Sequence, residues 1–290
     1  MKVLILGITG MLGSAVFHSL NQAKNLEVWG TLRKKSALNH FPEEYHARIV
    51  NDVEVLDIDN LLKVCETIRP NVIINCIGLI KQLAVAKDPL VVLPINAMLP
   101  HRLANIASLI QARLIHISTD CVFSGKKGNY RESDLSDAED LYGKSKYIGE
   151  VSKGSALTIR TSIIGHELNS NYALVDWFLS QKENIKGFSK AIFSGFPTME
   201  LARIIRDYVL PQEDLSGLYH VASNAIDKYS LLSLIAEVYN KKINIIEDTA
   251  LEINRSLNAE RFNSATGYIP PQWPELISSM HASRHLFGVK

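Results

Sequence analysis

The sequence has few cysteines, and their spacing suits neither a metal site nor a disulfide framework. Among 290 residues there are three, Cys65, Cys76 and Cys121, an odd number, widely separated and each in an apolar segment. Zinc sites and small secreted domains instead place cysteines in closely spaced sets. The histidines, including His166 and His220, show no metal-ligand spacing either. We therefore expect reduced thiols in a cytoplasmic protein, and no metal site.

Excess charge and long apolar runs are also missing. A net charge of +1 argues against nucleic acid or an anionic membrane as the main partner. No apolar run approaches the roughly 20 residues of a membrane span. The first predicted strand begins at residue 2, so we expect no signal peptide. Hydrophobic residues make up 47% of the chain and charged residues 21%, which is enough to bury a sizeable core.

What is present in the first half is an alternation of strands and helices. It predicts an α/β fold of the Rossmann type, a doubly wound parallel sheet with right-handed crossovers and ligands beyond the C-terminal strand ends. The predicted strands are Val3–Leu6, Leu26–Leu32, Arg48–Val50, Val72–Asn75, Arg113–Ser118 and Ala156–Arg160, and the predicted helices are Met11–Ala23, Asp59–Ile68, Pro94–Gln111 and Leu141–Lys153.

The pattern loosens after Arg160. We expect a dinucleotide-binding domain over 1–160 and a smaller C-terminal α/β substrate-binding part over 161–290, with segments near 196–222 returning to the large sheet. Predicted helices there are Tyr172–Gln181, Met199–Val209, Leu231–Tyr239 and Pro274–Leu286, and predicted strands are Gly217–Ala222 and Asn244–Ile246. Trp177 is expected in the core rather than as a base-stacking platform.

The first strand runs directly into glycines at 7, 10 and 13. Gly7 allows a tight turn, Gly10 lets the backbone approach a pyrophosphate, and Gly13 lets the next helix pack close to the strand. The helix begins near Met11, so its free N–H groups and positive dipole end face the phosphates. With Thr9 between the first two glycines, this turn predicts a nicotinamide dinucleotide cofactor.

The end of the second strand indicates which dinucleotide. No acid lies between Glu27 and Glu43, whereas Arg33 and Lys34 can pair with a 2′-phosphate. We therefore expect NADPH, with NADH left open. Asp57 and Ile58 are placed to flank the adenine; the alternative for Asp57 is the N-cap of the following helix.

Tyr142 and Lys146 project from one face of a predicted helix. A phenol can protonate the oxygen of a ketone that accepts a hydride, and a neighbouring ammonium favours the phenolate of a group that otherwise titrates near pH ~10. Thr119, with Ser118 as the alternate, ends the fifth strand and can orient the carbonyl. These residues predict a ketone reductase.

Together the motifs resemble the extended short-chain dehydrogenase/reductase superfamily, and within it the dTDP-4-dehydrorhamnose reductase family. The resemblance spans nearly the whole chain and implies reduction of the C4 ketone of a nucleotide-linked 4-keto-6-deoxy sugar, for a surface polysaccharide. It is carried by Ile117-Ser118-Thr119-Asp120-x-Val122-Phe123-x-Gly125, Tyr142-Gly143-Lys144-Ser145-Lys146, Arg160-Thr161-Ser162, Phe196-Pro197-Thr198, Gly217-Leu218-Tyr219-His220 and Arg255-Ser256-Leu257-Asn258.

Two departures from the family pattern bear on the substrate. Cys121 stands where the family usually has Tyr, and Ile163 where it usually has Trp. Both aromatic positions lie near the sugar in the family, so their loss implies a larger pocket. We expect a bulkier sugar, such as a UDP-linked N-acetylated analogue; the alternative is dTDP-4-dehydrorhamnose itself. The Glu that related 4,6-dehydratases carry after Thr-Asp is also missing, which disfavours dehydration.

The expected substrate contacts are Lys81, Asp120, Cys121, Ile163 and Arg255, with Gln82 and Arg261 as weaker candidates. The expected cofactor contacts are Gly7, Thr9, Gly10, Met11, Leu12, Gly13, Arg33, Lys34, Asp57, Ile58, Cys76, Gly78, Ser118, Tyr142 and Lys146. Three alternatives stay open: an epimerase of the same fold, a non-catalytic regulatory subunit that binds nucleotide, and a homodimer rather than a monomer.

Overall fold

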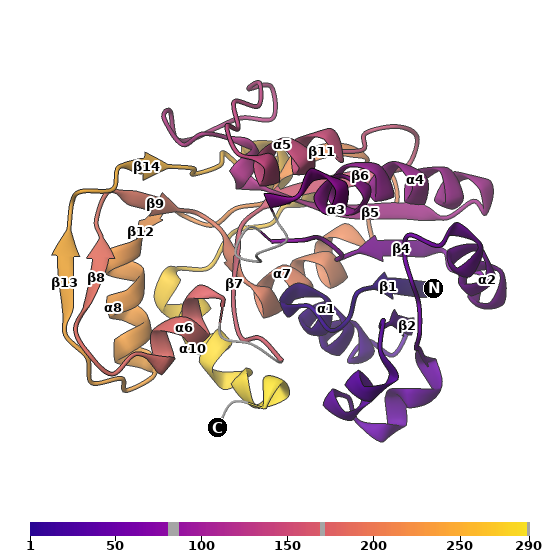
Figure 1. Ribbon diagram of the computed structural model, residues 1–290, viewed down its shortest axis with the longest axis horizontal. Coiled ribbons are helices and arrows are strands. Elements are labelled where there is room, and N and C mark those ends of the chain that lie inside the picture. Colours follow the sequence, from indigo (N-terminus) through magenta and orange to yellow (C-terminus); the bar gives the residue numbers. More distant parts are fainter. Residues whose placement is uncertain (81–86, 169–171, 289–290) are drawn as a thin grey trace.

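A seven-stranded parallel sheet forms the centre of the protein. The computed structural model describes residues 1–80, 87–168 and 172–288. The strand order is β11-β6-β5-β4-β1-β2-β3, and every pairing in this sheet is parallel (Figure 1). This order is that of the Rossmann fold. The strands are β1 (Lys2–Leu6), β2 (Glu27–Thr31), β3 (Ile49–Val50), β4 (Val72–Asn75), β5 (Arg113–Thr119), β6 (Leu157–Thr161) and β11 (Gly217–His220).

Helices cover both faces of the sheet. Along β1, Val3 and Ile5 belong to one buried cluster, whereas Leu4 and Leu6 belong to another on the opposite face. A strand buried on both sides must be apolar throughout, which is why β1 reads as a continuous hydrophobic run. The helices of this part are α1 (Met11–Asn21), α2 (Ile58–Ile68), α3 (Pro89–Val92), α4 (Leu99–Leu109), α5 (Leu141–Ile148) and α7 (Thr198–Ile204).

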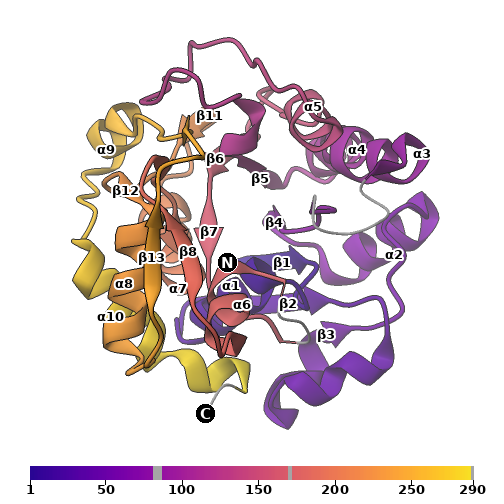
Figure 2. The same cartoon turned by 60° about the vertical axis from the view of Figure 1, so that its left-hand side comes forward.

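Small sheets and further helices form the other end of the molecule (Figures 1 and 2). β7 (Ile163–Ile164) pairs with β10 (Phe196–Pro197), β8 (Ile185–Phe188) with β13 (Ile245–Asp248), and β9 (Ala191–Phe193) lies between β12 (Ile226–Asp227) and β14 (Ile253–Asn254). The helices are α6 (Leu174–Ser180), α8 (Lys228–Val238), α9 (Glu260–Thr266) and α10 (Trp273–Ala282).

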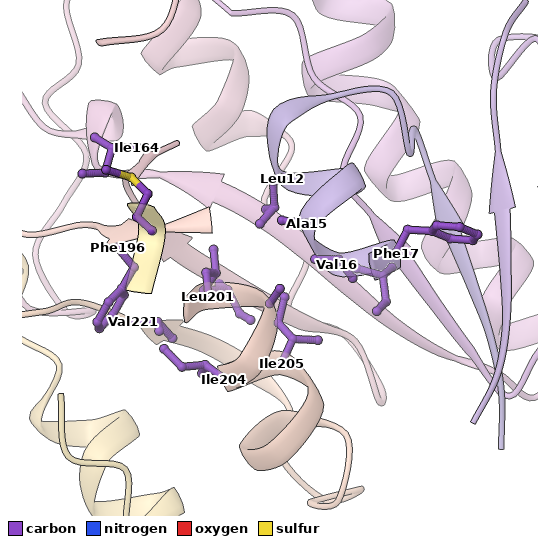
Figure 3. Close-up of a cluster of buried hydrophobic side chains, with 14 of the residues drawn as sticks. Leu12, Ala15, Val16, Phe17, Ile164, Phe196, Leu201, Ile204, Ile205 and Val221 are labelled. Carbon is purple, nitrogen blue, oxygen red and sulfur yellow. The ribbon is translucent and has the colours of Figure 1, made fainter. Parts of the chain in front are cut away.

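The second half of the chain also completes the first. β11 pairs with β6 in the large sheet. Helix α7 packs on α1, and buried side chains from both helices, among them Val16, Leu201 and Ile204, lie in one cluster (Figure 3). The apolar face of α1 is therefore covered by residues that follow it by nearly two hundred positions.

Several predicted elements differ in detail from the observed ones. The helix predicted over Leu141–Lys153 ends at Ile148. The next residue, Gly149, passes so close to the Asn96 carbonyl that a side chain there would collide with it. Trp177 was predicted in the core, but its side chain is 38% exposed on α6. Of the strands in the small sheets, β13 was predicted in part, as Asn244–Ile246, whereas the others and helix α9 were not predicted.

The helix predicted over Pro94–Gln111 begins earlier and is interrupted. It consists of α3, a π-helical turn at Leu93–Met98, and α4. The continuous stretch Pro89–Leu109 has the length and mean hydropathy (1.2) of a membrane span, contrary to our expectation that no run would qualify. However, α4 packs on β4 and β5 and contributes Leu99, Leu103 and Ile106 to the core, as a helix covering a sheet does.

Candidate active site

The glycine turn after β1 has the geometry that the sequence predicted. Gly7 has a φ of +83°, which favours glycine. A side chain at Gly13 would collide with the Gly7 carbonyl, so helix α1 packs directly on the turn. At Gly10, in contrast, a Cβ atom would meet only the Gly7 oxygen at 3.5 Å. Gly10 caps α1 without a side-chain hydrogen bond, which leaves the first-turn N–H groups of α1 uncapped by a side chain.

Arg33 and Lys34 follow β2 and are exposed, as a pair that meets a phosphate in solvent would be. Asp57 accepts a hydrogen bond from the Asn60 backbone N–H (3.1 Å) and is the N-cap of α2. The N-cap role that we left open for Asp57 is thus observed. This N-cap hydrogen bond uses one of the two carboxylate oxygens of Asp57.

Helix α5 begins directly against the turn that follows β5. Thr119 Oγ1 accepts a hydrogen bond from the Cys121 backbone N–H (3.1 Å). A side chain at Gly143 would collide with the Cys121 carbonyl, so the neighbouring Tyr142 lies close to this turn. Burial and the charge of Cys121 raise the pKa of Tyr142, while a hydrogen bond with Thr119 opposes them. Tyr142 is therefore protonated at neutral pH.

Lys146 lies one helical turn after Tyr142 and is buried, with 5% of its surface exposed. Its Nζ donates to the Ile117 carbonyl of β5 (2.7 Å) and lies 3.8 Å from the position of a Cβ atom at Gly78. Burial lowers the pKa of Lys146 to about 8. Burial also raises the pKa of the nearby Cys76 thiol to about 12, so Cys76 is neutral. Thr119, Tyr142, Lys146 and Gly78 thus lie around one point at the C-terminal edge of the sheet.

Asn96 is part of this arrangement and was missed by the sequence analysis. It lies in the π-helical turn, where its Oδ1 accepts from the Leu79 N–H (2.8 Å) and its Nδ2 donates to the Leu79 carbonyl (3.0 Å) and to Ser145 Oγ (3.3 Å). It therefore ties the loop after β4 to α5. The sequence shows only an amide within an apolar helical stretch; its burial and its partners emerge in the structure.

The substrate-side candidates lie beside the same turn. Arg255 donates to the Phe123 carbonyl (2.8 Å), and its Nη1 lies 3.7 Å from Cys121 Sγ. Burial raises the pKa of Asp120, against the charge of Arg255 and a hydrogen bond with Ser162. Ile163 follows Ser162 directly, so both departures from the family pattern adjoin Asp120. Lys81 and Gln82 lie outside the described residues.

Two candidates have other partners. Ser118, our alternate for Thr119, donates its hydroxyl to Glu150 (2.7 Å), which favours Thr119 over Ser118 as the predicted orienting hydroxyl. Arg261, a weaker candidate for the diphosphate, lies over the Tyr219 ring at 4.4 Å. Within the described ranges, no set of His, Cys, Asp and Glu side chains could hold a metal ion.

Comparison with known proteins gives one family. A family model described as the RmlD substrate binding domain matches residues 1–283. The chain is 26% identical over 262 residues to methionine adenosyltransferase 2 subunit beta of Bos taurus (82% of this chain, 72% of that protein), and 26% identical over 298 residues to the dTDP-4-dehydrorhamnose reductase of Escherichia coli K12 (94% of each).

Among solved structures, the fold is similar to that of a dTDP-4-dehydrorhamnose reductase from Bacillus anthracis in complex with NADP, with a TM-score of 0.79 and 22% identity over 97% of this chain and 99% of that one. The family model extends over both the large sheet and the smaller part. The chain therefore belongs to the RmlD family of extended short-chain dehydrogenase/reductases, the family that its motifs indicated.

Proposed function

We propose that this chain is an oxidoreductase that uses NADPH to reduce the C4 ketone of a nucleotide-linked 4-keto-6-deoxy sugar. The observation that carries the proposal is the convergence of Thr119, Tyr142 and Lys146 beside the loop after β4, at the sheet edge that also bears the glycine turn. Family membership supports the reaction class. Synthesis of a deoxysugar for a surface polysaccharide is the biological role we assign to it.

The residues present fit a nicotinamide dinucleotide. Gly10 is open to a close approach, and α1 has no side-chain cap and no acid in its first turn, as a pyrophosphate requires. Arg33 and Lys34 would pair with the 2′-phosphate of NADPH. When bound, NADPH supplies the hydride. Lys146 would donate to the ribose hydroxyls, next to Gly78 and Cys76.

Each of the three side chains has a distinct role in the reduction. Tyr142 holds its proton at neutral pH and gives it to the oxygen on which charge develops. Thr119 orients the carbonyl and hydrogen-bonds the developing alkoxide. Lys146 provides a positive charge that stabilises the phenolate left on Tyr142, with a pKa of about 8 that keeps most of it protonated near neutral pH.

The sugar that we favour carries an N-acetyl group on a UDP carrier. Cys121 and Ile163 are smaller than the aromatic residues usual in the family, and the hydrogen bond between Asp120 and Ser162 brings their two segments together. The enlarged space would therefore be continuous. Arg255, beside Cys121, would contact the nucleotide diphosphate or the substituent.

The experiment is NADPH oxidation followed by absorbance, with dTDP-4-dehydrorhamnose and a UDP-linked N-acetyl-4-keto-6-deoxyhexose side by side. We expect faster turnover of the UDP sugar, and higher catalytic efficiency with NADPH than with NADH. Preference for the dTDP sugar would refute the argument that Cys121 and Ile163 enlarge the pocket for a bulkier sugar, but not the reductase proposal. Preference for NADH would remove Arg33 and Lys34 from their role, and turnover of neither sugar would refute the reductase proposal.

A second candidate is a subunit that binds nucleotide and modulates another enzyme. It is favoured by the similarity to a protein named as a subunit of methionine adenosyltransferase 2. Such a role needs neither Tyr142 nor Lys146, yet both are present with Thr119. Co-purification of a stoichiometric enzyme partner, together with no turnover of either sugar, would support it over the reductase.

A further inference from the structure

A third residue continues the face of α5 that carries Tyr142 and Lys146. Glu150 follows Lys146 by four residues, as Lys146 follows Tyr142. Although α5 ends at Ile148, Gly149 keeps a right-handed helical conformation, and the Glu150 N–H donates to the Tyr147 carbonyl (3.1 Å). The Glu150 side chain is only 10% exposed. A carboxylate is therefore buried one turn beyond the lysine.

Two residues of neighbouring strands hold this carboxylate. Ser118 Oγ, on β5, donates to Oε1 at 2.7 Å. Arg160, on β6, donates through Nε to Oε1 (2.7 Å) and through Nη2 to Oε2 (2.6 Å). Such a two-point contact between a planar guanidinium and a carboxylate is the strong form of an ion pair. Glu150 is thus fixed as an anion.

The far side of Arg160 is fixed as well. Its Nη1 lies 3.3 Å from His220 Nε2, and its guanidinium lies 5.1 Å from the centre of the Phe123 ring. His220 Nδ1 lies 3.0 Å from the Tyr130 carbonyl, so Nδ1 carries the proton and Nε2 accepts from Arg160. Burial lowers the pKa of His220 to about 3, so its charge does not change near neutral pH.

Among the residues that the structure describes, few other groups balance the charge of Lys146. Burial lowers its pKa, and the two groups that oppose burial are Glu150 and, after it, Cys76. The Cys76 thiol is neutral near pH 7. His116 on β5 is also neutral, since burial and the charge of Lys146 hold its pKa well below the usual range, with a further contribution from His101 on α4. Of these groups, Glu150 is the one held in a two-point ion pair with a guanidinium, that of Arg160.

We propose that Glu150 is a positioning residue for the reduction: its carboxylate, held by Ser118 and Arg160, keeps Lys146 protonated and directed at the Ile117 carbonyl. The contacts tie three elements together, since Lys146 binds the backbone of β5 at Ile117 while Glu150 binds the next residue, Ser118. The inference deepens the proposed function, on which it rests for the catalytic use of the Lys146 charge.

The test measures the ionisation of Lys146 directly, without cofactor or substrate. The full chain is labelled with ¹³C at lysine Cε, the Lys146 signal is assigned with Lys146→Arg, and its chemical shift is followed with pH. We expect wild type to titrate near 8 and Glu150→Gln to titrate lower by about one pH unit or more. Glu150→Asp, which keeps the charge, should stay closer to wild type than Glu150→Gln.

Glu132→Gln is the matched control. Glu132 accepts from the His220 backbone N–H (2.8 Å) and so belongs to the same network, but it is not among the groups that shift the pKa of Lys146. Its removal should leave the Lys146 titration in place. An unchanged titration in Glu150→Gln would overturn the proposal.

Glu150→Gln leaves Arg160 buried without its partner and is the variant at risk of not folding. In that case Glu150→Gln/Arg160→Gln is compared with Arg160→Gln, which lacks the same positive charge. Lys146 should titrate lower in the double variant than in Arg160→Gln, and an equal titration in the two would refute the proposal. In the enzyme, the alkaline limb of kcat/KM should move down with the titration. Because the titration needs no ketone, it succeeds or fails independently of the proposed reaction.

Discussion

The pKa of Tyr142 lies above its ordinary value, whereas the pKa of Lys146 lies below its ordinary value. Burial acts on both, raising the pKa of the phenol and lowering that of the ammonium, because each charged form loses solvation. Near pH 7 the tyrosine is thus a proton donor and the lysine is still largely a cation. This pairing suits the reduction of a ketone, in which the phenol gives up its proton beside a positive charge.

Replacing the phenol hydroxyl tests the proton donor. We expect Tyr142→Phe to lower kcat by roughly 10²- to 10⁴-fold, the usual contribution of general acid catalysis, while the Kd for NADPH changes little. Tyr147→Phe is the control. Tyr147 lies on the same helix and is 42% exposed, so this variant should keep kcat near that of wild type. Turnover at the wild-type rate in Tyr142→Phe would remove that residue from its role.

Burial of Lys146 should also be visible in the stability of the protein. Between pH 8 and 10.5 the unfolded chain holds the Lys146 proton more tightly than the native protein does. The contribution of this group to the free energy of unfolding therefore rises with pH across that window. Below the window, burial of the charged ammonium destabilises the native protein by its full amount.

Lys146→Met removes the cost of burying the ammonium, and with it the pH dependence of stability that this group causes. We expect the stability of the variant relative to wild type to be greater at pH 7 than at pH 10.5, by up to about 3 kcal/mol, measured by urea unfolding. The hydrogen bond to Ile117 is lost at both pH values and cancels in the comparison. An equal difference at the two pH values would show that burial does not shift Lys146.

Among the elements, the turn from β1 into α1 separates two uses of glycine. Gly13 is required for packing, because its missing side chain makes room for the Gly7 carbonyl. Gly10 has no such constraint within the protein. Its φ of −75° is open to any residue, so the absence of a side chain there matters only for a ligand.

The two positions should respond differently to alanine. We expect Gly13→Ala to lower the melting temperature, with a cost of about 1–3 kcal/mol for overpacking, and to weaken NADPH binding. Gly10→Ala should leave the melting temperature within a few degrees of wild type and still weaken NADPH binding, measured by calorimetry. Wild-type affinity in Gly10→Ala would mean that no pyrophosphate approaches this turn.

The elements also show how far the sequence could predict the structure. The long strands and helices of the large sheet were predictable, because strong periodicity and the glycine turn define them locally. The strands β7, β10, β12 and β14 have two residues each, too few for any pattern. Asn96 and Glu150 were missed because what identifies them is a partner far along the chain, Leu79 in one case and Ser118 and Arg160 in the other.

In the molecule as a whole, the two halves are joined through the central sheet rather than by a linker. β6 has β11 as its outer neighbour, and α1 has α7 on its apolar face. Arg113 at the start of β5 is buried and donates to the Val209 and Leu215 carbonyls. The two sides of the boundary that we predicted near residue 160 therefore share one sheet and one core, and the division of roles across it stays a prediction.

A fragment of residues 1–160 should accordingly fail to form a native sheet. It would expose β6 as an edge and leave the Arg113 guanidinium without its carbonyl partners, at a cost that a domain stabilised by about 5–15 kcal/mol cannot absorb. Circular dichroism and amide hydrogen exchange would measure this, with the full chain as the control. A cooperative thermal transition in the fragment would contradict the prediction.

The late arrival of β11 and α7 has a consequence for the synthesis of the protein on the ribosome. Sixty residues separate Arg160, on β6, from His220, which ends β11. At about 5–20 residues per second, roughly 3 to 12 s pass between the emergence of the two strands. During that interval the nascent chain presents an unpaired strand and the uncovered face of α1. We therefore expect it to be a client of the chaperones that bind unfinished chains.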